Sequence, residues 1–304
     1  MVSTEQTINT MHDDMIHDAQ LDYYSRKLAT ASSDRTVRLF DVIETGQYQA
    51  IAELKGHTGA VWQVSWAHPK FGNLLASCSY DNKVIVWKEN NGQWQMAWDS
   101  SSVSLHSSSV NSVAWCPHEY GLRLACGSAD GNVSVVTYNP EDSTWVKSYV
   151  SQDTHGEGVN AVSWGPYQEQ ANPRLATAGC DNKAKIWELI EGVWIAIGEL
   201  KREGSKSAHD DWVRDIAWAP SIGMPASVVA TCGQDMKVYI WTLEGEEWKA
   251  HELGGKNHQF NDVVWRVSWS VTGNILAVTC GDKVTLWKEA VGNEWQLMQV
   301  VDTQ

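Results

Sequence analysis

Basic residues are scarce in this sequence of 304 residues. It contains 23 Lys and Arg against 37 Asp and Glu, which gives a formal net charge of −14 at pH 7 and a pI near 5.1. No segment of the sequence is a basic run. Proteins that bind the phosphate backbone of nucleic acids need dense Lys and Arg. The composition therefore predicts no nucleic-acid partner.

Long apolar segments are missing as well. The sequence has no apolar stretch of about 18 residues, the length that crosses a bilayer as a helix. Its opening segment, MVSTEQTINT, has neither the basic region nor the apolar region of a secretion signal. We expect a soluble chain without direct membrane insertion, in the cytosol or the nucleus.

Catalytic motifs are also missing. The sequence has no P-loop, dinucleotide-binding fingerprint, nucleophile elbow or HExxH motif. The string SADGNVSVV at 128–136 begins like a sialidase Asp box, but its glycine comes one residue too early. His–Asp clusters at 12–15 and 208–212 fall on positions that a repeat already explains. We predict no enzyme, no catalytic residue, no cofactor and no metal site.

Tryptophan, in contrast, is abundant, with 18 residues against only 3 Phe. Five of the tryptophans end similar strings: VWQVSW (61–66), VNSVAW (110–115), VNAVSW (159–164), VRDIAW (213–218) and VWRVSW (264–269). The strings recur about every 50 residues, a period typical of repeat proteins. A histidine precedes each string, in the order His57, His106, His155, His209 and His258.

A second series runs in parallel with the first. Its aspartates are each followed six residues later by an apolar residue: Asp34 and Phe40, Asp81 and Trp87, Asp130 and Val136, Asp181 and Trp187, and Asp235 and Trp241. In the sixth unit Asp282 precedes Trp287 by only five residues, which predicts a tighter turn there.

Each unit contains four short runs of β-branched and aromatic residues bounded by Gly, Asn, Asp and Ser. Four short antiparallel strands per repeat are typical of a β-propeller blade. A first unit without the tryptophan is also present, since His12 lies nine residues before Leu21. We predict an all-β, six-bladed propeller over 12–304, with blades at about 12–54, 56–100, 105–151, 154–201, 208–254 and 257–301, after an N-terminal segment 1–11.

The units resemble WD-repeat propellers, in which one histidine, one aspartate and the tryptophan that ends the third strand share a buried hydrogen-bond network. We expect the aspartate in the turn between the second and third strands, where it can cap backbone N–H groups. The resemblance implies structural roles for His57, His106, His155, His209, His258, Asp34, Asp81, Asp130, Asp181, Asp235, Trp87, Trp187, Trp241 and Trp287.

The cysteines follow the same period. Five of the 6 fall in the second strand of a unit or just before its turn, namely Cys78, Cys126, Cys180, Cys232 and Cys280. Equivalent positions in different blades are too far apart for a disulfide. We expect free thiols in a reducing compartment.

The way in which the ring closes suggests a partner. Each unit holds all four of its strands in one segment, so no strand exchange joins the first blade to the sixth. We predict an open ring whose exposed flanks are completed by a blade that a partner donates. The candidate partner-binding residues are Met11, Met15, Ile16 and Leu21 on the first blade, and Phe260, Val264, Trp265 and Val267 on the sixth.

An enzyme with its site in the central channel is the alternative to an interaction scaffold. Such a site needs convergent carboxylates or metal ligands on the innermost strands. These strands carry Asn111, Asn160, Arg214, Asp215 and Arg266, a mixed set without paired acids. An interaction scaffold is therefore favoured over a channel enzyme. A WD-repeat adaptor that binds other proteins is one form of such a scaffold.

Several strings make the resemblance more specific. HDDMIHDAQLDYYSRKLATASSDRTVRLFDV, GHTGAVWQVSWAHPKFGNLLASCSYDNKVIVWKE, DWVRDIAWAPSIGMP and FNDVVWRVSWS are closely similar to the Sec-thirteen (SEC13) family over about residues 10–300. The resemblance implies a scaffold subunit of the COPII vesicle coat in ER-to-Golgi transport, of the Y-shaped nuclear pore scaffold and of the amino-acid-sensing GATOR complex. It implies α-solenoid partners, the coat cage rod subunit and a nuclear pore scaffold subunit, which insert a seventh blade. The implied places are the cytoplasmic face of the endoplasmic reticulum, COPII vesicles, the nuclear pore and the lysosomal surface.

Overall fold

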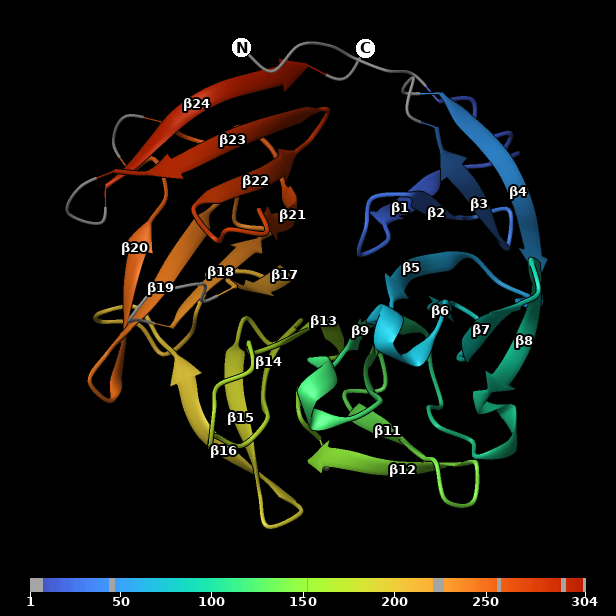
Figure 1. Cartoon of the computed structure of the whole chain (residues 1–304). Coiled ribbons are helices and arrows are strands. Elements are labelled where there is room, and N and C mark those ends of the chain that lie inside the picture. The colour runs from blue at the N-terminus through green and yellow to red at the C-terminus, as the bar shows by residue number, and fades with distance from the viewer. Residues whose placement is uncertain are drawn as a thin grey trace. The chain divides into compact units, whose positions relative to one another are not determined.

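The computed structural model describes residues 8–43, 47–151, 153–220, 227–255, 258–290 and 294–302. Most of the N-terminal segment, residues 1–7, lies outside the described residues. The described chain forms strands β1 to β24 and three short 3-10 helices, η1 (Pro69–Phe71), η2 (Ser100–Ser102) and η3 (His118–Tyr120). The strands assemble into six sheets of four, which confirms the all-β, six-bladed propeller (Figure 1).

The first three blades use consecutive strands. Blade 1 contains β1 (Ile16–Leu21), β2 (Lys27–Ser32), β3 (Thr36–Val42) and β4 (Tyr48–Lys55). Blade 2 contains β5 (Val61–Trp66), β6 (Leu74–Ser79), β7 (Val84–Asn90) and β8 (Gln93–Asp99). Blade 3 contains β9 (Val110–Trp115), β10 (Arg123–Ser128), β11 (Val133–Asn139) and β12 (Thr144–Ser151).

The last three blades repeat the pattern. Blade 4 contains β13 (Val159–Trp164), β14 (Arg174–Gly179), β15 (Ala184–Ile190) and β16 (Val193–Leu200). Blade 5 contains β17 (Val213–Trp218), β18 (Val228–Gly233), β19 (Val238–Glu244) and β20 (Glu247–Glu252). Blade 6 contains β21 (Val264–Trp269), β22 (Ile275–Cys280), β23 (Lys283–Glu289) and β24 (Trp295–Asp302). Within the described residues no sheet takes a strand from another blade.

The chain divides into two compact units. The first comprises residues 1–128 and 136–147, and the second comprises residues 129–135 and 148–304. Blade 3 contributes to both, so blades 1 and 2 belong to the first unit and blades 4, 5 and 6 to the second.

Within each unit, neighbouring blades pack by one rule. The second and third strands of a blade present small and β-branched side chains to the first strand of the next blade. In the second unit Ala230 and Cys232 of β18 pack with Val264 and Val267 of β21. In the first unit Ala76 and Cys78 of β6 pack in the same way with Val110 and Val113 of β9. These side chains are almost fully buried, so each interface removes apolar surface from water and stabilises the fold.

The repeated tryptophan at the end of the first strand ties adjacent blades together. Trp66 donates its indole N–H to the backbone carbonyl of Gln20 at 2.9 Å, which joins blade 2 to blade 1. Trp269 donates in the same way to Ala217 at 3.0 Å, which joins blade 6 to blade 5. This contact gives a physical reason for the tryptophan in these blades, whereas the indole N–H of Trp218 in blade 5 is buried without a hydrogen-bond partner among the described residues.

A second tie runs between the same strands. The side chain of Asp18 in β1 accepts a hydrogen bond from the backbone N–H of Val64 in β5, at 3.0 Å. Asp215 of β17 accepts from the N–H of Val267 in β21, also at 3.0 Å. The blades within a unit are therefore joined by directed hydrogen bonds as well as by apolar contact.

The turn between β22 and β23 is shorter than its counterparts, as the sequence predicts. Cys280 pairs with Lys283, which leaves Gly281 and Asp282 as a two-residue turn, and Gly281 has a φ of 56°. Two-residue hairpin turns need positive φ, which glycine adopts at little cost. All six cysteines are free thiols.

Candidate interaction surfaces

Blade 5 shows the repeated histidine in a chain of hydrogen bonds. The indole N–H of Trp241 donates to Thr231 Oγ1 at 2.8 Å. Thr231 Oγ1 lies 2.9 Å from His209 Nε2, and His209 Nδ1 lies 2.9 Å from a carboxylate oxygen of Asp235. Because the carboxylate can only accept, Nδ1–H donates to Asp235. Both ring nitrogens of His209 are therefore bonded.

The same chain of hydrogen bonds recurs in blades 2 and 4. In blade 2 it runs from Trp87 through Ser77 to His57 and Asp81, with distances of 2.9, 2.8 and 3.0 Å. In blade 4 it runs from Trp187 through Thr177 to His155 and Asp181, with distances of 3.0, 2.9 and 2.8 Å. Burial lowers the pKa of His155, which favours the neutral form of its ring.

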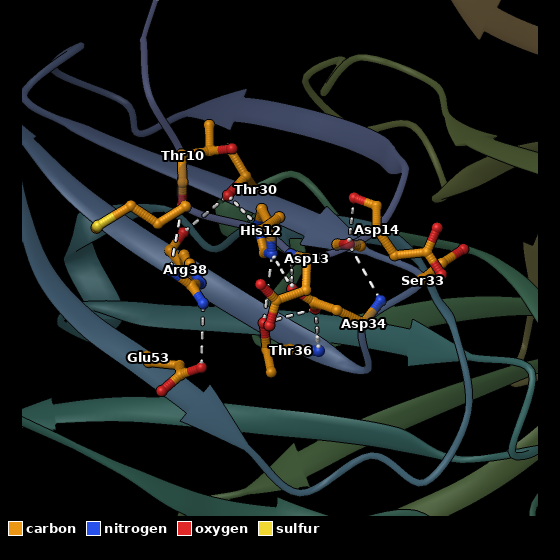
Figure 2. Close-up of polar contacts among 12 residues, drawn as sticks. Thr10, His12, Asp13, Asp14, Thr30, Ser33, Asp34, Thr36, Arg38 and Glu53 are labelled. Carbon is orange, nitrogen blue, oxygen red and sulfur yellow. Dashed lines mark hydrogen bonds and ion pairs between the residues drawn. The ribbon is translucent and has the colours of Figure 1, made fainter.

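Blade 1 has a shortened version of the chain. His12 lies 2.7 Å from the carboxylate of Asp34 and 2.8 Å from Thr30 Oγ1, and Figure 2 shows both ring nitrogens engaged. The residue at the tryptophan position is Phe40, which is buried but has no N–H to donate. The loop that precedes β1 is thus fixed to the β2–β3 turn by His12 and by backbone contacts, among them the N–H of Asp13, which donates to Asp34 at 3.2 Å.

The aspartates also bind the turn itself. Asp81 accepts from the backbone N–H groups of Thr58 at 2.8 Å and Lys83 at 3.0 Å. Burial acts to raise the pKa of Asp81, but hydrogen bonds from His57, Thr58 and Lys83 outweigh it and lower the pKa to about 2. The network holds a loop against a turn, and in blades 1, 2, 4 and 5 it uses the polar atoms of the histidine fully.

Blades 3 and 6 depart from this pattern. Blade 3 has Cys126 at the Ser/Thr position and Val136 at the tryptophan position. In blade 6 Val278 replaces the hydroxyl residue, and Trp287 donates instead to Thr285 Oγ1 at 2.9 Å. His258 packs edge-on against Trp287, with ring centroids 5.1 Å apart. The sixth histidine is therefore in an aromatic environment.

The Ser/Thr residues of the network were missed by the sequence reasoning. A signal for them is present, since a hydroxyl residue stands four positions before the aspartate in blades 1, 2, 4 and 5: Thr30, Ser77, Thr177 and Thr231. In the described part of the chain, no cluster of three or more His, Cys, Asp or Glu could hold a metal ion. None of the described helices is long and apolar enough to cross a membrane.

The first strand of blade 1 leaves exposed the side chains that its counterparts bury. Ile16 corresponds to Val61, which is fully buried against blade 1, yet Ile16 is 45% exposed. Ala19 and Leu21 on the same strand are also exposed. Met11 and Met15, which precede the strand, are exposed apolar residues too. All four candidates on this blade are thus accessible.

Three of the four candidate partner-binding residues on blade 6 are buried, so they do not form an accessible surface. Phe260, Val264 and Val267 are 8%, 0% and 4% exposed and belong to the core that blade 6 forms with blade 5. They are buried because the first strand of a blade packs against the preceding blade. Trp265, the fourth candidate, is 47% exposed and stacks on the guanidinium of Arg214, 4.7 Å from its ring centroid.

The flank of blade 6 that points away from blade 5 lies on β22 and β23. Its side chains Ala277, Thr279, Val284 and Leu286 are partly exposed. Their counterparts in blade 5, which face blade 6, are between 0% and 2% exposed: Ala230, Cys232, Val238 and Ile240. Sequence reasoning missed this set, although the packing of small residues at these positions recurs in the other blades.

Similarity to known proteins agrees with this architecture. The family described as "WD domain, G-beta repeat" matches residues 4–41, 48–88, 99–136, 146–188 and 200–242. "Protein transport protein sec13" of Schizosaccharomyces pombe is 58% identical over 96% of this chain and 98% of its own length. "Protein transport protein SEC13 homolog A" of Arabidopsis thaliana is 55% identical over 98% of this chain and 99% of its own. "Protein SEC13 homolog" of Dictyostelium discoideum is 53% identical over 98% of both chains.

The chain belongs to the SEC13 family. The WD-repeat matches end before blade 6, the blade whose turn is shortened and whose histidine packs on Trp287. In blades 1, 2, 4 and 5 of this chain the repeated polar residues hold the entry loop against the turn. The outer flanks of blades 1 and 6 carry exposed or partly exposed apolar side chains.

Proposed function

We propose that this SEC13-family chain is a non-enzymatic scaffold subunit that accepts strands from a partner against blades 1 and 6. One observation carries the proposal. The flank positions that are buried between neighbouring blades within each unit are exposed at the start of blade 1 and at the end of blade 6. Apolar positions of this kind are normally covered in native proteins.

The inter-blade ties define what an added blade must supply. Asp18 gives an acceptor to the N–H of Val64, and the equivalent N–H in blade 1 is that of Ala19. An added strand next to β1 should therefore offer an acceptor to Ala19. To cover the flank of blade 6, the partner should bring β-branched residues against Ala277 and Leu286. The addition of a strand with such pockets is a known mode of recognition.

The partner classes follow from the family. We infer an α-solenoid subunit of the COPII outer cage on vesicles leaving the endoplasmic reticulum, and an α-solenoid subunit of the Y-shaped nuclear pore scaffold. Membership of the GATOR complex at the lysosomal surface belongs to the same proposal. The relatives named protein transport proteins support the transport role. A docked blade would bury an interface of more than about 2,000 Å², in the range of permanent complexes.

No enzymatic role is proposed for the chain. The histidines that could serve as bases are bonded on both ring nitrogens in blades 2, 4 and 5, and the ring of His209 is buried. These bonds favour a structural function of the repeats over catalysis, including catalysis in a central channel.

The test uses a charge on the flank of blade 6. Leu286→Arg should fold, because the side chain is partly exposed, and should lose the solenoid partner in affinity purification followed by mass spectrometry. Val271→Arg is the matched control, since Val271 is 82% exposed on a loop away from this flank. A folded Leu286→Arg protein that retains all partners of the wild type would overturn the proposal.

A further inference from the structure

A cavity of about 670 Å³ lies between the outer parts of blades 2 and 3 in the first unit. Its walls come from β6, β7 and β8 on one side, and from the ends of β11 and β12 on the other. The lining residues are Phe71, Leu74, Val86, Lys88, Ala97, Trp98, Ser102, Val103, Gly121, Leu122, Tyr138, Pro140, Ser143, Thr144 and Trp145. Its size falls within the range of ligand-binding pockets.

Trp98 makes this cleft different from its counterparts. It pairs with Val86, the residue just before the aromatic of the third strand. At the same register position other blades have smaller or polar residues: Ala52, Gly198, His251 and Gln299. The equivalent cleft between blades 5 and 6, lined by His251 and Trp295, encloses only about 160 Å³. The cleft that contains Trp98 is therefore wider than the cleft between blades 5 and 6, and its lining is aromatic.

Aromatic rings from both blades line the cleft. Trp145 lies 5.4 Å from Trp98 and 5.2 Å from Tyr138, measured between ring centroids. The lining is also fixed at Val103, whose carbonyl accepts a hydrogen bond from Lys147 Nζ at 2.6 Å. The cleft is thus bounded by groups that are packed or hydrogen-bonded within the same unit.

Three side chains of the lining, Lys88, Trp98 and Trp145, carry polar groups that can only donate. The indole N–H groups of Trp98 and Trp145 and the hydroxyl of Tyr138 have no hydrogen-bond partner in the part of the chain that the structure describes. Lys88 is the one charged residue of the lining, and no described carboxylate pairs with it. The Thr144 hydroxyl at the rim already donates to Asp142, at 2.6 Å. A ligand that fits should bring acceptors and negative charge.

We propose that this cleft binds a proline-rich segment of another protein that carries an acidic residue next to its prolines. Aromatic grooves are the surfaces on which polyproline II segments dock, because the segment is preformed and apolar. Proline offers carbonyl acceptors and no N–H donor, which matches the free indole and phenol donors. The carboxylate would pair with Lys88. This surface is separate from the flanks of blades 1 and 6.

The probe is a fluorescein-labelled peptide of about eight prolines preceded by two aspartates, long enough to form polyproline II turns. Fluorescence polarisation with the full chain should show saturable binding. Trp98→Ala, which installs the residue of blade 1, should weaken binding roughly tenfold or more, as expected for a central aromatic anchor. Lys88→Glu should weaken the aspartate-bearing peptide and leave an uncharged proline peptide unchanged.

His251→Ala in the narrow cleft is the matched control and should bind like the wild type. Circular dichroism establishes whether each variant is folded. If Trp98→Ala does not fold, Lys88→Glu still tests the proposal, because Lys88 is exposed. The proposal is overturned if the wild type does not bind the peptide. It is equally overturned if folded Trp98→Ala and Lys88→Glu proteins both bind it as the wild type does.

Discussion

Trp269 donates its indole N–H to the backbone carbonyl of Ala217 across 3.0 Å, so the last blade is tied to the one before it. Trp66 and Trp115 make the same contact with Gln20 and Ser65. In these three blades the tryptophan therefore serves as a tie to the preceding blade. Blade 1 has Leu21 at this position, which has no N–H in its side chain to donate.

Removing one such tie should weaken the fold. Trp269→Phe keeps an aromatic ring but leaves the carbonyl of Ala217 without its donor, so we expect a loss of about 1 kcal/mol in the free energy of unfolding. Urea unfolding followed by circular dichroism measures it. Trp212→Phe is the control, because Trp212 is 42% exposed. Equal stability of the two variants would contradict the role of the tie.

The centre of the hydrogen-bond chain should matter more than its end. Thr231→Val leaves both His209 Nε2 and the Trp241 indole buried without partners, and should cost roughly 2–4 kcal/mol. Trp241→Phe removes only a donor, as Phe40 does naturally in blade 1, and should cost less from this loss alone. The same unfolding experiment compares them. A loss below about 1 kcal/mol for Thr231→Val would argue against the hydrogen-bond chain as described.

Acid should destabilise the protein through the turn aspartates. The folded-state pKa of Asp81 is about 2, below its ordinary value of 3.8, so the unfolded chain takes up the proton at higher pH than the folded chain does. The stabilisation is present above about pH 4 and is lost as the pH falls towards 2. Asp81→Asn should therefore be less stable than the wild type at pH 5, and the difference should shrink by pH 2.5. A constant difference over this range would exclude the linkage.

Two equivalent tryptophans should respond differently to the same change. Trp62 donates to Ser109 Oγ at 2.9 Å and packs on His17, so Trp62→Asp should destabilise the first unit. Trp265 is half exposed, so Trp265→Asp should fold and, as we propose, bind the solenoid partner less well. A pull-down beside circular dichroism decides. Full partner binding by a folded Trp265→Asp protein would exclude Trp265 from the docking surface.

The repeat pattern was enough to predict six blades, because each histidine, aspartate and tryptophan holds one place in the blade. It predicted even the degenerate first blade, where His12 and Asp34 still meet. The sequence also located the tighter turn at Asp282. These features are local, since the spacing of a few residues within one repeat determines them.

The interaction surfaces were harder to predict because they depend on which blade each side chain faces. Val264 and Val267 were assigned to a partner, but the first strand turns them towards blade 5. The exposed flank at Ala277 and Leu286 could be recognised only from the packing between blades 5 and 6, where the equivalent residues of blade 5 are buried. The cleft beside Trp98 likewise results from tertiary packing at a position that follows no repeat.

The central claim is that a partner covers the flanks of blades 1 and 6. Hydrogen–deuterium exchange, measured on the chain alone and with the solenoid subunit that co-purifies with it, tests this most directly. We predict slower exchange in peptides that cover β1, including the N–H of Ala19, and in peptides from β22 and β23, while β9 between blades 2 and 3 stays unchanged. Protection confined to other blades, with β1, β22 and β23 exchanging as in the free chain, would contradict the account.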